Sequence, residues 1–202
     1  MDNLQYEKEA ILKGYRFICG IDEVGRGPLA GPVVACACIM DLTDVIEGVD
    51  DSKKLSEKKR EKLFEEIKSK AICYSICEID HEEIDKINIL NATKKCMLNC
   101  VNSLELKPDL LLIDAVKLDT DIEQLNIIKG DAKSYSIACA SILAKVYRDR
   151  LMKEYAKEYP LYAFDKNAGY GTKVHREAIM EYGPCKIHRK TFIKNFWVDK
   201  GN

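Results

Sequence analysis

The sequence lacks the long apolar runs of a membrane protein. Its longest uncharged stretch near the start, residues 27–40, is shorter than the roughly 20 apolar residues that cross a bilayer, and it contains two prolines. The first residues, MDNLQYEKEAILKGYR, mix charged with apolar side chains and have no signal-peptide core. We therefore expect a cytoplasmic protein with no membrane partner.

The sequence also lacks the spacings of a zinc site. It has no Cys-x-x-Cys motif and three histidines, and its nine cysteines are odd in number and scattered through apolar runs. Cys36 and Cys38 fall on one face of an expected strand, and Cys96 and Cys100 on one face of an expected helix. We expect reduced thiols, buried as small apolar side chains.

Net charge is nearly absent, at −1 over 202 residues, and by itself does not favour a nucleic-acid partner. The charges are unevenly distributed, however. Residues 129–202 have a balance of +7 and the 128 residues before them a balance of −8. This asymmetry is compatible with a basic surface beside an acidic centre.

Five short runs rich in β-branched and small apolar residues predict strands, and four longer patterns predict helices. The expected strands are 16–22, 32–40, 71–79, 110–114 and 126–130. The expected helices are 55–70, 89–103, 134–159 and 172–182, with a loop over 160–171 and a last short element over 188–196. Ser56 and Asn88 are the predicted N-caps of the first two helices. The predicted inner faces of these two helices include Leu63, Phe64, Ile67, Leu90, Cys96, Met97 and Cys100.

The order of these elements predicts an α/β protein. Three strands come first with short connections, and strands alternate with helices afterwards, which favours a mixed sheet covered by helices over a doubly wound parallel one. The chain has no repeat and no Ser/Pro-rich linker. We expect a single domain, with a sheet-and-helix core over about residues 1–159 and a C-terminal helical segment over about residues 160–202.

Four acidic residues follow apolar strands. Asp22 and Glu23 end the first strand, Asp114 ends the fourth, and Asp131 lies just beyond the fifth. Buried carboxylates repel one another and are costly unless protons or a hard cation offset the charge. Mg²⁺ and Mn²⁺ prefer oxygen ligands, and two such ions about 4 Å apart can stabilise both the attacking and the leaving oxygen of a phosphodiester displacement.

Asp22 and Glu23 pose a geometric difficulty, because neighbours on a regular strand point to opposite faces. They can share a metal site only if the strand ends or bulges there, and Gly25 and Gly27 supply the backbone freedom for a bend. Each acid taken singly is as well explained by a turn at the end of a strand. The four taken together favour a metal site.

The stretch GRGPLAG has the glycines of a dinucleotide-binding loop but not its context. That fingerprint needs a helix immediately afterwards, whereas Pro28, Pro32 and an apolar strand follow here. A Walker A motif is absent as well. What remains is a loop with open backbone N–H groups and the Arg26 guanidinium beside the acids, which suits contact with a sugar–phosphate backbone.

Seven stretches, in this order, resemble ribonuclease HII, the type 2 ribonuclease H: GIDEVGRGPLAGPVV, DSKKLSEKKRE, NILNAT, LLIDA, KGDAKSYSIACASILAKVYRD, GYGT and HRKTF. The resemblance covers residues 17–192. It implies a ribonuclease H-like fold with a mixed five-stranded sheet and a C-terminal helical extension. It also implies an endonuclease that cuts the RNA strand of RNA–DNA hybrids, including 5′ of a single ribonucleotide in duplex DNA, and leaves 3′-hydroxyl and 5′-phosphate ends.

The resemblance also assigns the acids. By their place in these motifs, Asp22, Glu23, Asp114 and Asp131 would be the catalytic ligands of two Mg²⁺ or Mn²⁺ ions. One departure lies beside them, because Ala115 stands where the family often has glycine. It bears on the local backbone and not on the role of Asp114.

Substrate recognition is implied for a loop and one aromatic residue. Gly25, Arg26 and Gly27 would contact the ribose 2′-hydroxyl, which alone distinguishes RNA from DNA at one site, and the adjoining phosphate. Tyr170 would pack against the sugar of the next nucleotide and so select the RNA–DNA junction; its flanking glycines favour an exposed ring over a buried one. The sister type, ribonuclease HIII, usually has lysine between the loop glycines and an additional N-terminal domain, so Arg26 favours type 2.

Several basic or polar residues are candidates for phosphate contacts. Ser52 and Lys53 precede the first long helix, and Lys145 and Arg148 lie one turn apart on another. A solvated surface charge explains each of them as well. The expected partners are the RNA–DNA hybrid duplex and ribonucleotide-containing DNA, and a monomer is the simplest expectation. The last residues, NFWVDKGN, contain no clear replication-clamp segment, and a weak one stays open.

Two other classes of function remain. A non-catalytic nucleic-acid-binding module would keep the fold without the chemistry, but it should have lost at least one of the four acids. A related nuclease on the same fold, such as a ribonuclease HIII or a junction resolvase, would share the acids and differ in substrate. Cleavage of a branched duplex free of ribonucleotides would support the resolvase.

Overall fold

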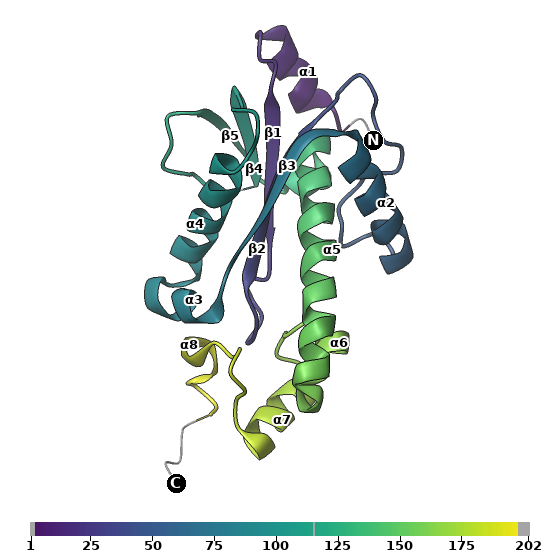
Figure 1. The fold of residues 1–202 in the computed structure, drawn as a ribbon. Helices are drawn as coiled ribbons and strands as arrows, with labels where there is room; N and C mark the ends of the chain where they lie inside the picture. Colours follow the sequence, from purple (N-terminus) through teal and green to yellow (C-terminus); the bar gives the residue numbers. More distant parts are fainter. Residues whose placement is uncertain (1–2, 115, 198–202) are drawn as a thin grey trace.

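The computed structural model describes residues 3–114 and 116–197 (Figure 1). Its strands are β1 (Ile18–Val24), β2 (Val33–Met40), β3 (Ala71–Ile79), β4 (Leu110–Asp114) and β5 (Glu123–Ile127). Its helices are α1 (Gln5–Leu12), α2 (Glu57–Lys70), α3 (His81–Ile87), α4 (Ile89–Asn102), η1 (Gly130–Ala132), α5 (Tyr135–Glu158), η2 (Pro160–Tyr162), α6 (Phe164–Asn167), α7 (Lys173–Tyr182) and α8 (Lys190–Ile193), where η marks a 3₁₀ helix.

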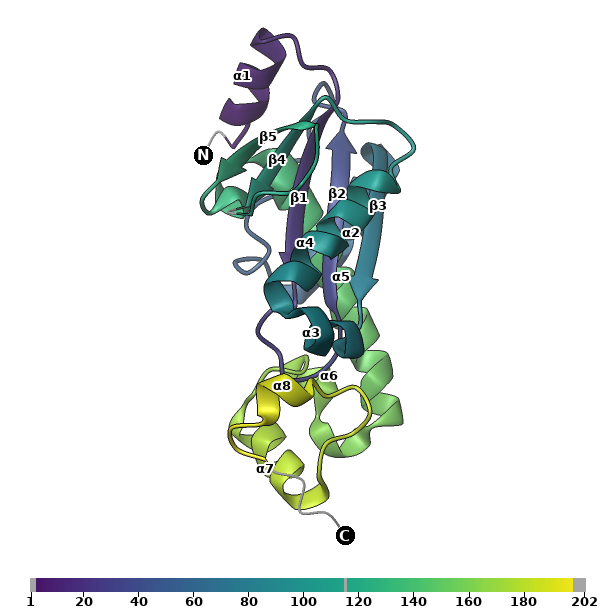
Figure 2. The same ribbon diagram turned by 90° about the vertical axis from the view of Figure 1, so that its left-hand side faces the viewer.

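The five strands form one mixed sheet in the order β3-β2-β1-β4-β5. β2 runs antiparallel to both β1 and β3, and β4 is parallel to β1 and to β5. Helices α3 and α4 cover one face, and α2 and α5 cover the other (Figures 1 and 2). This is the predicted α/β architecture.

The side chains of β2 point alternately to the two faces of the sheet, so that one strand contributes to a hydrophobic core on each face. Val33, Ala35, Ala37 and Ile39 belong to the core that includes α4, whereas the residues between them belong to the core under α2 and α5. All eight residues of β2 are buried. β1 comes so close to α5 that a Cβ added to Gly20 would lie 2.1 Å from the carbonyl carbon of Ser136. Small residues are therefore required where helices press on both faces.

Most predicted elements are confirmed, including the N-caps Ser56 and Asn88, whose side chains accept hydrogen bonds from Lys59 N and Asn91 N. The predicted inner faces of α2 and α4 are buried, except that Leu90 is 45% exposed, because its neighbour Ile89 is the residue that packs against the core at the start of α4. The nine cysteines are free, and seven of them are buried.

Two predictions about elements were wrong, and two helices were missed. The last strand spans Glu123–Ile127 and not 126–130, because the chain turns after Ile127 into η1. Residues 160–171 contain the short helices η2 and α6 in place of a plain loop, with Ala163 and Ala168 at positive φ around α6. Helices α1 and α3 were not predicted; α3 has a clear signal in Asp80, whose side chain caps Glu83 N.

The C-terminal segment lies beyond one end of the sheet, against the far end of α5, while α1 lies at the opposite end (Figures 1 and 2). A backbone bridge between Ala30 and His188 joins this segment to the connection between β1 and β2. Over the described ranges 3–114 and 116–197, no helix has the length and apolarity needed to cross a membrane.

Candidate active site

The ladder between β1 and β4 ends just before the first acids. These parallel strands pair through Ile21 and Ile113, and Asp22 and Asp114 are the next residues of each. β1 stays paired with β2 to its end in unbroken register. Asp22 and Asp114 therefore lie where β1 and β4 separate. Because β1 has no partner among the described residues on this side beyond Ile21, Glu23 can approach Asp22 and Asp114 without a bulge in the strand.

A tight turn brings the fourth acid to this edge. β5 pairs with β4 as far as Ile127, which lies beside Asp114. The chain then passes through Lys129, at φ +57°, into η1, which carries Asp131. The N–H groups of Gly130 and Lys129 donate to the Asp114 carboxylate and oppose the rise of its pKa. The turn thus places Asp131, 5% exposed, next to Asp114.

Mutual repulsion shows that the four acids lie together. Burial raises the pKa of Asp22 well above its usual range, and the charges of Glu23 and Asp131 raise it further. Burial also raises the pKa values of Glu23 and Asp114. At Glu23 the charge and hydrogen bond of Arg26 oppose this rise and the charge of Asp114 adds to it, and at Asp114 the charge of Asp131 adds to the rise. Each acid is therefore repelled by two of the others, so that the four form a closed ring of like charges.

This ring suits a hard divalent cation. Its donors are all carboxylate oxygens, and the Oε2 atom of Glu23 is buried without a hydrogen-bond partner. As the side chains stand in residues 3–114 and 116–197, no three Asp, Glu, His or Cys groups enclose one ion. Two cationic side chains approach the acids instead: Lys53 Nζ lies 3.0 Å from Asp131 Oδ2, and Arg26 Nη1 lies 3.3 Å from Glu23 Oε1.

The predicted recognition residues lie beside the acids. Gly25 has φ +91°, and a Cβ there would lie 2.3 Å from Arg148 Nε, so this position requires glycine. Arg26 and Gly27 are exposed. The ring of Tyr170 is 43% exposed, as predicted from its flanking glycines, and its Cε1 atom lies 3.6 Å from the Cβ position of Gly27. The structure therefore brings Tyr170 next to the glycine loop.

The predicted phosphate contacts divide into surface and interior residues. Lys53 has an exposed side chain, and Lys145 pairs with Asp149 at 2.6 Å. Ser52 is buried, and its Oγ atom lies 2.9 Å from that of Ser141, whose hydroxyl in turn bonds to Asp22. Arg148 is fully buried and donates to three backbone carbonyls, so its side chain does not reach the surface.

Sequence reasoning missed the residues behind the site. Ser141 belongs to the apolar face of α5 and adjoins Asp22, and its place in an Ala/Ser/Ile run gave no sign of this. Arg189 is fully buried and contacts the glycine loop. Its only signal was its place in HRKTF, where a run of basic residues looks like an ordinary charged surface.

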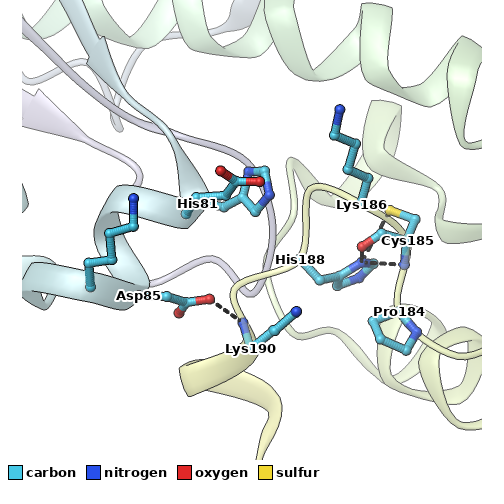
Figure 3. Close-up of a pocket in the computed structure, with 9 residues that line it drawn as sticks. His81, Asp85, Pro184, Cys185, Lys186, His188 and Lys190 are labelled. Carbon is cyan, nitrogen blue, oxygen red and sulfur yellow. Dashed lines mark hydrogen bonds between the residues drawn. The ribbon is translucent and has the colours of Figure 1, made fainter. Parts of the chain in front are cut away.

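A separate hollow of about 510 Å³ lies between the C-terminal segment and α3 (Figure 3). Cys185, His188, Lys190 and Asp85 are among its lining residues. Asp85 accepts hydrogen bonds from the backbone N–H groups of Lys190 and Thr191, which ties α3 to α8. His188 borders this hollow, and its Nε2 atom lies 3.0 Å from His175 Nε2; the Nδ1 atom of His175 in turn lies 2.9 Å from Tyr170 O.

A mixed five-stranded sheet with carboxylates gathered where its central strands separate is the architecture of the ribonucleases H, and solved structures confirm the fold. Ribonuclease H2 from Pyrococcus horikoshii OT3 is 28% identical, with a TM-score of 0.75 over 87% of this chain and 93% of that one. Ribonuclease HII of Archaeoglobus fulgidus, solved in complex with PCNA, is 25% identical, with a TM-score of 0.75 over 93% and 98% of the two chains.

Sequence comparison gives the family. The model of the ribonuclease HII family matches residues 19–199, and ribonuclease HII of Caldicellulosiruptor saccharolyticus is 58% identical over 95% of this chain and 94% of its own. The chain belongs to the ribonuclease HII family. It is accordingly a ribonuclease H, a hydrolase of the endonuclease type that acts on RNA–DNA substrates and depends on divalent metal ions.

Proposed function

We propose that this enzyme cuts the RNA strand of RNA–DNA hybrids and also cuts 5′ of single ribonucleotides embedded in duplex DNA. The products are a 3′-hydroxyl and a 5′-phosphate. The observation that carries the proposal is the closed ring of four mutually repelling acids beside the exposed Arg26–Gly27 loop and the Tyr170 ring. The acids support phosphodiester hydrolysis. The loop and the Tyr170 ring support discrimination between ribose and deoxyribose.

Asp22, Glu23, Asp114 and Asp131 would hold Mg²⁺ or Mn²⁺, in a two-ion arrangement. Bound there, the ions would lower the pKa of the attacking water and stabilise the charge that develops on the phosphate. Glu23 offers an unpartnered oxygen for this purpose, while Asp22 and Asp131 are held by burial. Lys53 and Arg26 neutralise part of the negative charge and thereby reduce the repulsion that a phosphate would meet.

Recognition depends on the groups next to the acids. Gly25, Arg26 and Gly27 form the proposed recognition loop. Gly27 is exposed and has no side chain, so the backbone there can approach a ribose, and the polar groups of the loop can bond a 2′-hydroxyl. The exposed ring of Tyr170, which lies beside Gly27, would pack on the following sugar, and a further hydroxyl on that sugar would crowd it. Lys53, Lys145 and the hydroxyl of Ser52 remain proposed contributors to phosphate binding or to its support.

Removing one acid tests the proposed chemistry. In Asp114→Asn the charge is lost at nearly constant shape, and we expect cleavage to fall by at least about a thousandfold because a metal ligand is lost. Asp119→Asn is the matched control, since Asp119 is exposed in the segment after β4. Rates are measured on a duplex with one ribonucleotide, with Mg²⁺ or Mn²⁺ titrated and the cut position mapped.

The outcomes separate the candidate functions. Cleavage by Asp114→Asn at the normal rate would remove that acid from the site. Binding without cleavage by the unaltered protein, at any metal concentration, would make it a non-catalytic module. Cleavage of a branched duplex without ribonucleotides would favour a resolvase on the same fold.

A further inference from the structure

Two arginines are fully buried without a carboxylate partner. Arg148 and Arg189 are 0% exposed, and neither forms an ion pair within the described residues. Burial lowers the pKa of Arg148 to about 10 and that of Arg189 to about 9, so both stay charged at neutral pH. Burying an unpaired charge is costly, and such a cost is usually offset by multiple hydrogen bonds.

The hydrogen bonds of both guanidinium groups go to backbone carbonyls around the glycine loop. Arg189 donates from Nη1 to Arg26 O at 3.0 Å and from Nη2 to Gly25 O at 2.6 Å. Its Nε and Nη2 atoms also lie 3.0 and 2.8 Å from Gly31 O. The side chain therefore spans the loop from Gly25 to Gly31, which lies shortly before β2.

Arg148 supports the same loop from α5. Its Nε atom donates to Pro32 O at 3.0 Å and its Nη2 atom to Ala30 O at 3.2 Å. Its Nη1 atom donates to Ala168 O at 2.9 Å, two residues before Tyr170. The two predicted recognition segments are thus joined through one buried side chain.

Peptide geometry fixes what the loop presents on its outer side. The peptides of the described residues are trans, and in a trans peptide the C=O and the following N–H point in opposite directions. Because Gly25 O and Arg26 O face Arg189, the N–H groups of Arg26 and Gly27 face away from it. Both residues are exposed, and in the part of the chain that the structure describes neither N–H has a hydrogen-bond acceptor.

We propose that Arg189, with Arg148 as a second support, is a positioning residue for substrate recognition. It holds the N–H groups of Arg26 and Gly27 toward the sugar–phosphate backbone of the ribonucleotide strand. Its charge polarises the two peptides that it bonds and strengthens their N–H donors toward an anion. This role rests on the proposed function of the glycine loop and extends it to residues that never touch the substrate.

Lysine variants test the role while keeping the charge. In Arg189→Lys a single ammonium group cannot span Gly25, Arg26 and Gly31 as the planar guanidinium does. Metal-free protein is titrated with two labelled duplexes that differ in one ribonucleotide. We expect the preference for the ribonucleotide duplex to fall about tenfold, and KM in the metal-loaded assay to rise more than kcat falls. Arg148→Lys should show a smaller change of the same kind.

Arg150→Lys is the matched control. Arg150 lies on the same helix as Arg148, is exposed, and pairs with Glu61 and Glu65 on α2. The proposal would be overturned if Arg189→Lys weakened the binding of both duplexes equally. It would also be overturned if Arg189→Lys and Arg150→Lys showed the same preference for the ribonucleotide duplex; Arg189 would then be a structural residue. If the unaltered protein neither cuts nor prefers the ribonucleotide duplex, the proposed function itself fails, which is a distinguishable result.

A measurement on the unaltered protein covers the case in which Arg189→Lys does not fold. Amide hydrogen exchange at Arg26 and Gly27 should be fast in the free, metal-free protein, because their N–H groups are exposed and unbonded. The ribonucleotide duplex should slow both amides more than the all-DNA duplex does. Unchanged exchange at both amides in the presence of saturating duplex would overturn the proposal.

Discussion

At the scale of single residues, the acids were predictable and their supports were not. Asp22, Asp114 and Asp131 each follow an apolar run, and the ends of neighbouring strands meet at one edge of a sheet. Strand periodicity therefore predicts that they gather. Arg189 has no such signal, because only the folded chain shows that a residue within the basic run KIHRK is buried under the glycine loop.

One residue near the acids gives a sharp test of packing. A Cβ on Gly20 would lie 2.1 Å from the backbone of Ser136, which cannot move without displacing α5. We expect Gly20→Ala to lower the free energy of unfolding by about 3 kcal/mol because of this overlap. Chemical denaturation measures the change.

Gly27→Ala is the control for that experiment. The nearest atom to its Cβ position is Tyr170 Cε1 at 3.6 Å, an ordinary contact, so stability should change by less than about 0.5 kcal/mol. A Gly20→Ala protein as stable as Gly27→Ala would show that β1 and α5 are not packed as closely as described.

At the scale of elements, periodicity located the long helices and most strands but failed where tertiary contacts set the boundary. The strand β5 has a single buried residue, Ile127, so its pattern is too weak to mark its ends. Helix α1 has no side-chain N-cap, and its buried residues are Glu7 and Ala10, so it shows no apolar stripe. A glutamate on a short charged helix looks like a surface residue until its partner is known.

The buried glutamate of α1 leads to a prediction at this scale. Glu7 Oε1 accepts hydrogen bonds from Ser134 Oγ at 2.6 Å and Ser136 N at 2.9 Å, at the N-terminus of α5. Glu7→Ala leaves these donors buried and unpaired, and we expect the free energy of unfolding to fall by about 2 kcal/mol. Glu9→Ala, on the exposed side of α1, should change it by less than about 0.5 kcal/mol. Equal effects in urea denaturation would contradict the described role of Glu7.

At the scale of the whole molecule, two hydrogen-bonded imidazoles join the C-terminal segment to the backbone of Tyr170. Cys185 N donates to His188 Nδ1 at 2.9 Å, so His188 carries its proton on Nε2 and donates to His175 Nε2 at 3.0 Å. His175 then donates from Nδ1 to Tyr170 O at 2.9 Å. Protonating His188 would place a proton on Nδ1, which could then no longer accept the hydrogen bond from Cys185 N.

This pair of imidazoles predicts an acid-sensitive fold. Burial, with the nearby charge of His175, lowers the pKa of His188 from 6.5 to about 4, and burial lowers that of His175 as well. Between pH 6.5 and 4 the unfolded chain therefore binds more protons than the folded one. The free energy of unfolding falls as the pH is lowered through this window, by about 3 kcal/mol for His188.

Thermal unfolding between pH 7 and pH 4 measures this loss. His188→Gln should show a shallower decline than the unaltered protein because the titrating group is gone. His81→Gln, at the partly exposed start of α3, should keep most of the decline, because the charge of His81 contributes least among the causes that lower the pKa of His188. The same slope in His188→Gln and His81→Gln would assign the acid sensitivity to other groups.

The bonds between Gly31 N and Ile187 O and between Arg189 N and Leu29 O join the loop after β1 to residues near the end of the chain. All four acids have been synthesised once residue 131 is added, but the loop beside them lacks these partners until residue 189 has left the ribosome. A growing polypeptide therefore contains all four acids well before it contains the residues that support the loop after β1. The loop after β1 is therefore fixed in place later in synthesis than the acids beside it.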